Sequence, residues 1–241
     1  MKLYDEVIAH INETLSAYQA KTLPVGETNW SDVGKAKMIL RSEMAYELGG
    51  DRLPALGSTI VTNSQDLVPQ DEIVLYGLDL PEISKDQPYA RITFVRTDES
   101  AMGEGNDLYN AIHRIEYFRY HVFPEGFMMR VSAASERECV RVGSEALDKG
   151  LDFAKIGNFM IDALHVHKDV QAVKVIFVTL PEADYDSLRE DYKMTKKITD
   201  TIDHMLKDVN MDCNSCSLQE VCDEVEGMKE LHFGISHNSL A

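Results

Sequence analysis

The sequence predicts an α/β protein: a mixed sheet packed by helices, with an N-terminal helical pair and a Cys-rich C-terminal tail. Three observations support this fold class. Apolar residues near the N-terminus recur at three- and four-residue steps, as on one face of a helix. Short β-branched or aromatic runs follow from about residue 58. Three of the four cysteines fall within residues 213–222, close to the C-terminus.

The N-terminal segment predicts two helices. Residues 3–20 place Val7, Ile8, Ile11 and Leu15 on one stripe. Residues 31–48 show similar spacing and are followed by Gly49-Gly50, and glycine is the usual residue after a helix C-terminus.

The later elements alternate in type. Strands are predicted over 58–62, 72–80, 89–97, 127–133 and 173–180. The run VKVIFVTL (173–180) is almost continuously apolar, which is typical of a central strand covered on both faces. Further helices are predicted over 107–122, 135–150, 153–165 and 182–209. The helix from 135 is predicted because Ser135 and Glu138 have capping-box spacing.

These elements suggest three parts: an N-terminal helical segment (1–57), an α/β domain (58–209) and a Cys-rich metal-binding tail (210–241). The length is sufficient for a sizeable core without disulfides.

Charge and hydropathy exclude several classes of function. The 24 Lys and Arg residues face 41 Asp and Glu, a formal net charge of -17. Nucleic-acid binders neutralise phosphates with clustered basic residues, so we expect no nucleic-acid partner. No apolar run approaches the roughly 20 residues that span a bilayer, and the N-terminus lacks a signal-peptide pattern. We therefore expect a cytoplasmic protein without a membrane partner.

The cysteine segment carries the clearest chemical signal. Cys213 and Cys216 form a Cys-x2-Cys pair, and Cys222 follows six residues later. Such thiolates bind tetrahedral zinc and iron–sulfur clusters alike. Three residues are candidates for a fourth ligand: Asp223, His232 and the distant Cys139. A redox disulfide between Cys213 and Cys216, or unligated thiols, are the alternatives.

Other polar residues give weaker signals. His165 and His167 form an HxH pair at a predicted helix end, where a solvated or capping role is the favoured interpretation. His113 and His121 lie near the core stripe of one helix, which Arg114 and Arg119 flank, and are interpreted as half-buried histidines. A basic patch is formed by Lys193, Lys196 and Lys197. It could receive a phosphate-bearing ligand, although an exposed helix face is the favoured interpretation.

Five segments carry a resemblance to a known family: MILRSEMAYELGG (38–50), NDLYNAIHRIEYF (106–118), EALDKGLDFAKIGNFMIDALH (145–165), VKVIFVTL (173–180) and CNSCSLQEVCDEVEGMKELHF (213–233). Their order resembles acetyl-CoA synthase, the β subunit of the CO dehydrogenase/acetyl-CoA synthase complex, over about residues 30–235. The resemblance implies α/β domains and a cysteine stretch that holds an iron–sulfur cubane bridged to nickel. In that stretch, Cys213 and Cys216 match the first cysteine pair and Cys222 the third. The Cys-Gly-Cys that holds the distal nickel in the family is absent here.

The resemblance thus implies an acetyl-CoA-synthase-like protein of one-carbon metabolism. It implies an iron–sulfur cluster on the three cysteines, without the complete nickel site. It also implies a protein partner in a one-carbon enzyme complex. Zinc or nickel are the other metals considered. The alternative is a non-catalytic module, zinc-stapled or metal-free, that helps assemble a one-carbon or corrinoid enzyme complex. A thiol redox protein is a third, weaker hypothesis.

Overall fold

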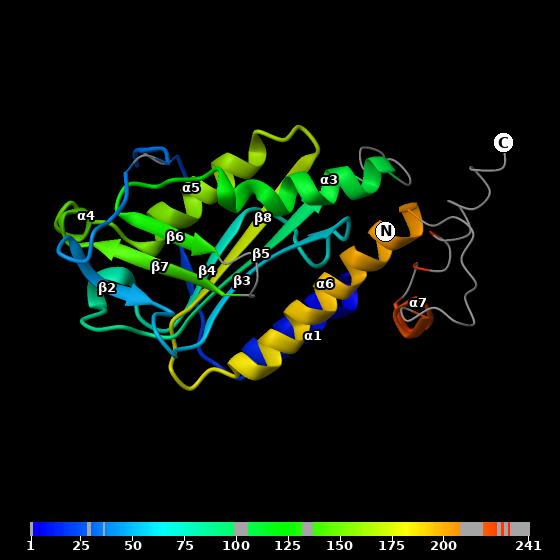
Figure 1. Cartoon of the computed structure of the whole chain (residues 1–241), viewed down its shortest axis with the longest axis horizontal. Coiled ribbons are helices and arrows are strands. Elements are labelled where there is room, and N and C mark those ends of the chain that lie inside the picture. The colour runs from blue at the N-terminus through cyan, green and yellow to red at the C-terminus, as the bar shows by residue number, and fades with distance from the viewer. Residues whose placement is uncertain are drawn as a thin grey trace.

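A computed structural model describes residues 2–27, 30–35, 37–98, 106–131, 137–207 and 219–225, together with Met228 and Leu231 (Figure 1). The elements, in chain order, are α1 (Asp5–Ser16), β1 (Lys21–Leu23), β2 (Met44–Leu48), β3 (Ala55–Thr62), β4 (Glu72–Tyr76), η1 (Leu80–Glu82), β5 (Tyr89–Thr97), α3 (Asn106–Glu116), η2 (Tyr117–Tyr120), β6 (Phe127–Val131), β7 (Glu138–Gly143), α4 (Ser144–Asp148), α5 (Phe153–His165), β8 (Val170–Val178), α6 (Tyr185–Lys207) and α7 (Gln219–Glu224).

Two sheets organise the described residues. The larger has strand order β1-β4-β8-β5-β3 and the smaller β2-β7-β6. Within the larger sheet, β4 with β8 and β3 with β5 run parallel, whereas β1 with β4 and β5 with β8 run antiparallel. The prediction of an α/β fold with a mixed, helix-packed sheet is therefore confirmed.

The predicted central strand is β8, in the middle of the larger sheet. Helix α5 packs on β8 and β4. Gly157 of α5 allows this close approach, because a Cβ atom there would lie 2.7 Å from Cδ1 of Ile73. Figure 1 shows α5 on one side of these strands and the α1–α6 pair on the other. The nearly continuous apolar run in β8 thus corresponds to a strand with little exposed surface, as the sequence predicted.

Helices α1 and α6 pack against each other. The stripe predicted on the first helix is buried: Val7, Ile8, Ile11 and Leu15. Polar contacts also join the pair, since the Tyr4 hydroxyl lies 3.0 Å from Oγ1 of Thr199 and Nδ1 of His10 lies 2.7 Å from a carboxylate oxygen of Asp191. The first predicted helix is confirmed.

The predicted second helix over 31–48 is wrong, so the N-terminal helical pair does not form. The described residues of this range contain the strand β2, which pairs antiparallel with β7. Tyr46 and Leu48 face the core, while Glu47 between them is only half-buried. Met38 and Leu40, assigned to the helix, expose 65% and 54% of their surface. Long-range pairing with β7 outweighs the local helical spacing.

The predicted helix over 135–150 is also largely wrong. Residues 138–143 form the strand β7, and only Ser144–Asp148 are helical; Ser135 lies outside the described residues. Val140 and Val142 are fully buried, and the residues between them are only half-buried, which is the two-residue period of a strand. Glu138 caps no helix; it forms a buried ion pair with Arg91.

Residues before position 57 contribute to both sheets, because β1 borders β4 and β2 borders β7. The division into 1–57, 58–209 and 210–241 stays a prediction. None of the described helices is long and apolar enough to cross a membrane.

Candidate functional site

The predicted cysteine ligands lie at the end of the described chain. Cys213, Cys216 and His232 fall outside the described residues, whereas the main chain of Cys222 and Asp223 belongs to α7. Helix α7 contacts α6, and Val221 on α7 is buried. Met228, shortly after α7, is completely buried. The chain on both sides of Cys222 is therefore fixed to the body of the protein.

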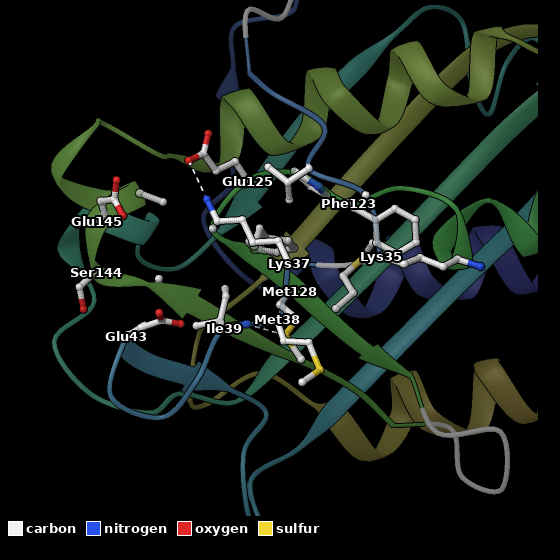
Figure 2. Close-up of a pocket in the computed structure, with 18 residues that line it drawn as sticks. Lys35, Lys37, Met38, Ile39, Glu43, Phe123, Glu125, Met128, Ser144 and Glu145 are labelled. Atoms are coloured by element: carbon white, nitrogen blue, oxygen red, sulfur yellow. Dashed lines mark hydrogen bonds and ion pairs between the residues drawn. The ribbon is translucent and has the colours of Figure 1, made fainter.

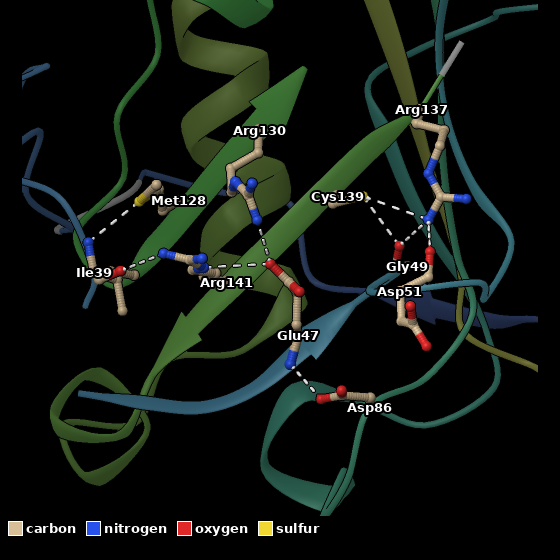
Figure 3. A network of polar contacts seen from close by, with 10 residues as sticks. All are labelled: Ile39, Glu47, Gly49, Asp51, Asp86, Met128, Arg130, Arg137, Cys139 and Arg141. Atoms are coloured by element: carbon tan, nitrogen blue, oxygen red, sulfur yellow. Dashed lines mark hydrogen bonds and ion pairs between the residues drawn. The ribbon is translucent and has the colours of Figure 1, made fainter. Parts of the chain in front are cut away.

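Cys139, the distant candidate for a fourth ligand, lies in β7 and is half-buried. Its thiol donates a hydrogen bond to the carbonyl oxygen of Gly49, 3.0 Å from Sγ. Nη2 of Arg137 donates to the same carbonyl (2.7 Å) and to that of Asp51 (2.8 Å). Figure 3 shows the two side chains converging on this turn. The role of Cys139 as a metal ligand stays a prediction. Among the described residues, no three His, Cys, Asp or Glu side chains gather as a metal site would require.

A separate polar network crosses the smaller sheet (Figure 3). Oε1 of Glu47 accepts hydrogen bonds from Arg130 (2.7 Å) and Arg141 (3.3 Å), so one carboxylate ties β2 to the neighbouring β7 and to β6 beyond it. Arg141 also donates to the carbonyl of Ile39 at 3.0 Å. These groups satisfy one another, which indicates a structural role.

The HxH pair has a structural partner. Nε2 of His165, at the end of α5, lies 3.0 Å from both carboxylate oxygens of Asp71. Asp71 also accepts a hydrogen bond from the backbone N–H of Val173 at 2.8 Å. The interaction joins the end of α5 to β8.

An apolar cavity of about 540 Å³ lies between residues 33–43, the start of β6 and α4. Figure 2 shows the side chains of Met38, Ile39 and Met128 around it. At its edge, Lys37 pairs with Glu125, with Nζ and Oε1 3.3 Å apart. Its walls offer apolar contact and few hydrogen-bonding groups.

A second cavity, of about 570 Å³, is polar and is called the basic cavity below. It is bounded by β3, by α3 with η2, by the residue before β7 and by α6. Four cationic side chains line it: Arg119, Arg137, Arg189 and Lys196. The sequence placed Lys196 in a basic patch with Lys193, but Lys193 pairs with Glu190 at 2.7 Å. The sequence does not reveal that these four cationic side chains lie together, because they come from segments that are far apart in the chain.

Glu116 is the unusual acid of the basic cavity. Burial raises the pKa of this carboxyl to about 7, against the opposing effects of Arg119 and of a hydrogen bond from Thr199. The Thr199 hydroxyl lies 3.5 Å from Oε1 of Glu116 and contacts Tyr4 on its other side. Burial also lowers the pKa of the neighbouring His113. Near neutral pH, Glu116 can therefore exchange a proton inside the cavity.

The family model described as CO dehydrogenase/acetyl-CoA synthase complex beta subunit matches residues 28–183. The chain belongs to this family. No curated protein matches the chain significantly.

The matched residues run from before β2 to the turn ahead of α6. They include most of both sheets, Cys139 and every wall of the basic cavity except α6. They end before α6 and before Cys213. The family relationship is therefore established for the α/β body, whereas the likeness of the cysteine segment to the family's cluster motif stays a prediction.

Proposed function

We propose that this member of the beta-subunit family binds a metal centre, an iron–sulfur cluster, through Cys213, Cys216 and Cys222. The α/β body would serve as the scaffold that carries the centre toward a protein partner in a one-carbon enzyme complex. The donor set fits this group, because cysteine thiolates are the usual ligands of iron–sulfur clusters. A bound cluster would supply electron transfer or, at an iron without a protein ligand, a position for a substrate.

One structural observation supports the proposal most directly: α7 is held against α6. Cys213 and Cys216 lie in sequence between Lys207, where α6 ends, and Gln219, where α7 begins. Because the two helices contact each other, both ends of this connection are fixed by the fold. Bringing residues together within a segment whose two ends are already held costs less entropy than in a free chain, which favours a meeting of the three thiols at one metal centre.

The fourth ligand distinguishes the forms such a centre could take. Asp223 follows Cys222 within α7, whereas His232 is near the C-terminus and Cys139 is bound to Gly49. If none of them binds, one iron keeps a position for an outside ligand. The missing Cys-Gly-Cys speaks against a complete binuclear nickel site, because the thiolates for the second metal are absent.

Anaerobic purification followed by analysis of iron, acid-labile sulfide, nickel and zinc tests the proposal. We expect iron and sulfide in equal amounts and a brown colour that oxidation bleaches. The matched pair of variants is Cys216→Ser, which should lose the metal, and Cys139→Ser, which should lose it only if Cys139 is the fourth ligand. Stoichiometric zinc with thiolate ligation would instead support the zinc-stapled module. A metal-free chain with freely titratable thiols would overturn metal binding altogether.

A further inference from the structure

The basic cavity has a local charge opposite to that of the chain. Four cationic side chains line it beside two carboxyl groups, Glu116 and Asp200, in a protein with a net charge of -17. Arg189 also pairs with Asp186, so the local positive charge comes mainly from Arg119, Arg137 and Lys196. Glu116 is moreover partly protonated near neutral pH. Gathering cationic side chains in one cavity does not make an acidic protein more soluble. Like charges also repel one another when they are brought together. A concave site lined by one sign of charge concentrates ligands of the opposite sign.

Two buried polar groups in the cavity wall have no hydrogen-bonding partner among the described residues. The first is the hydroxyl of Ser58, whose residue is only 3% exposed. The second is Nε–H of Arg119. Buried polar groups in folded proteins are nearly always hydrogen-bonded, so orphaned groups call for an explanation. Both residues line the same cavity, which points to a ligand that accepts hydrogen bonds there after a small side-chain adjustment.

Two of the arginines that line the cavity are held in place by other contacts. Nη1 of Arg119 donates to the carbonyl of Gly57 at 2.9 Å, and its guanidinium lies 5.2 Å from the ring centre of Tyr120. Arg137 is fixed through Nη2 alone, which donates to the carbonyls of Gly49, Asp51 and Leu53. Guanidinium groups fixed in this way lose little side-chain entropy when they bind an oxyanion.

We propose that the basic cavity binds a small molecule through a dianionic oxyanion group, held by Arg119, Arg137 and Lys196 with Ser58 as an additional donor. Charge-assisted hydrogen bonds from guanidinium groups match the oxygens of phosphoryl and carboxylate groups alike. The cavity of about 570 Å³ exceeds an inorganic anion in size, so the ligand extends beyond its anionic group. This inference concerns a site other than Cys213, Cys216 and Cys222 and does not depend on them.

Glu116 makes the proposed binding sensitive to pH. An ionised carboxylate in the wall repels a dianion, whereas the protonated form can donate a hydrogen bond to it. The charged or titratable groups around Glu116 come from every element that packs on it: His113 of α3, Arg119 of η2, Asp200 of α6 and Tyr4 before α1. Protonation of His113 would act in the same direction. Binding should therefore strengthen as the pH falls from 8 to 6.

The test is calorimetric titration of the full chain with inorganic phosphate, with succinate and with sodium chloride as the screening control. We expect saturable binding of phosphate or succinate when the two are compared at pH 8. Succinate, which stays largely dianionic over this range, should bind more tightly at pH 6 than at pH 8, whereas phosphate itself takes up a proton there and does not report on Glu116. The probe that binds more tightly indicates the class of ligand: phosphate indicates a phosphorylated compound and succinate a dicarboxylic acid. Weak, non-saturable heats that sodium chloride reproduces would overturn the proposal.

Two lysines on the same helix give a matched pair of variants. Lys196 lines the cavity, whereas Lys197 is exposed and does not. Lys196→Gln should weaken binding by roughly tenfold, the effect of one lost charge-assisted hydrogen bond, and Lys197→Gln should change it little. Ser58→Ala should weaken binding while leaving the fold intact, because its hydroxyl has no partner among the described residues. Equal losses in the two lysine variants would mean general charge attraction and would contradict a built site. Cys216→Ser should bind the anion normally, which separates this proposal from the metal proposal.

Discussion

Arg91 on β5 and Glu138 at the start of β7 form a completely buried, two-pronged ion pair that links the two sheets. Nε of Arg91 lies 2.6 Å from Oε1 of Glu138, and Nη2 lies 2.7 Å from Oε2. Neither side chain is exposed to solvent. Nη1 of Arg91 donates to the carbonyl of Ser58 and to the hydroxyls of Thr59 and Thr93, so all three guanidinium nitrogens are hydrogen-bonded. The pair stands directly behind the wall of the basic cavity.

Removing one member of this pair should be costly. Glu138→Ala leaves the Arg91 guanidinium buried without its counter-charge, and we expect the free energy of unfolding to fall by about 3–5 kcal/mol. Urea unfolding followed by circular dichroism measures this. The control is Glu190→Ala, whose side chain is 71% exposed and pairs with Lys193 on the surface of α6, and whose loss should cost less than about 1 kcal/mol. Equal losses in the two variants would contradict the special role of the buried pair.

Gly57 makes room for the Glu138 carboxylate. A Cβ atom at this position would lie 2.2 Å from Oε2 of Glu138, inside van der Waals contact. Gly57→Ala should therefore displace a carboxylate that has no free space and destabilise the protein by about 1–3 kcal/mol. Gly26→Ala is the matched control, because a Cβ atom there meets no neighbour within 4 Å. Thermal unfolding of both variants should show a lower midpoint for Gly57→Ala alone.

The sequence predicted the elements whose signal is local. Helices α5 and α6 show apolar spacing that matches their buried faces, and β8 shows the apolar run of a central strand. The strands β2 and β7 were missed for a physical reason. Their pairing joins residues about 95 positions apart, such as Glu47 and Arg141, and no short window contains that information. Glu138 looked like part of a capping box because a buried ion pair leaves no mark on local spacing.

The two candidate sites also differ in whether their residues are close together in the sequence. The cysteines are visible in the sequence because they lie within ten residues of one another. The basic cavity is not, since Ser58, Arg119, Arg137 and Lys196 meet only after both sheets and α6 have packed. The net charge of -17 predicted the absence of a nucleic-acid partner, and it says little about the charge of one cavity.

Glu116 should make stability depend on pH in a definite direction. Its folded-state pKa of about 7 lies above the ordinary value of 4.5. Below the ordinary value both states hold the proton, so there is no effect. As the pH rises toward 7 the unfolded state ionises first, and stability is lost; above 7 the cost stays constant. Glu116→Gln should remove this cost and raise the free energy of unfolding at pH 8 by about 1–2 kcal/mol, after discounting for its partial exposure.

Urea unfolding of the wild type and of Glu116→Gln at pH 5 and pH 8 checks this expectation. The difference between the two proteins should be small at pH 5 and should favour the variant at pH 8. Glu125→Gln is the control with the opposite sign, because hydrogen bonds from Lys149 and Lys37 lower the pKa of Glu125. A gain that is equal at both pH values would show that Glu116 is not protonated in the folded state near neutrality.

Cys216→Ser separates the tail from the body of the protein. Helix α7 packs on α6, and Val221 of α7 belongs to the buried apolar core. The variant should therefore lose bound metal and protection of the segment after α6 from proteases, while the body keeps its unfolding midpoint. Metal analysis, limited proteolysis and circular dichroism measure the three quantities on one preparation. If the substitution unfolds the whole chain instead, the metal centre is part of the core and the tail is no separate unit. If metal is retained, Cys216 is not among its ligands.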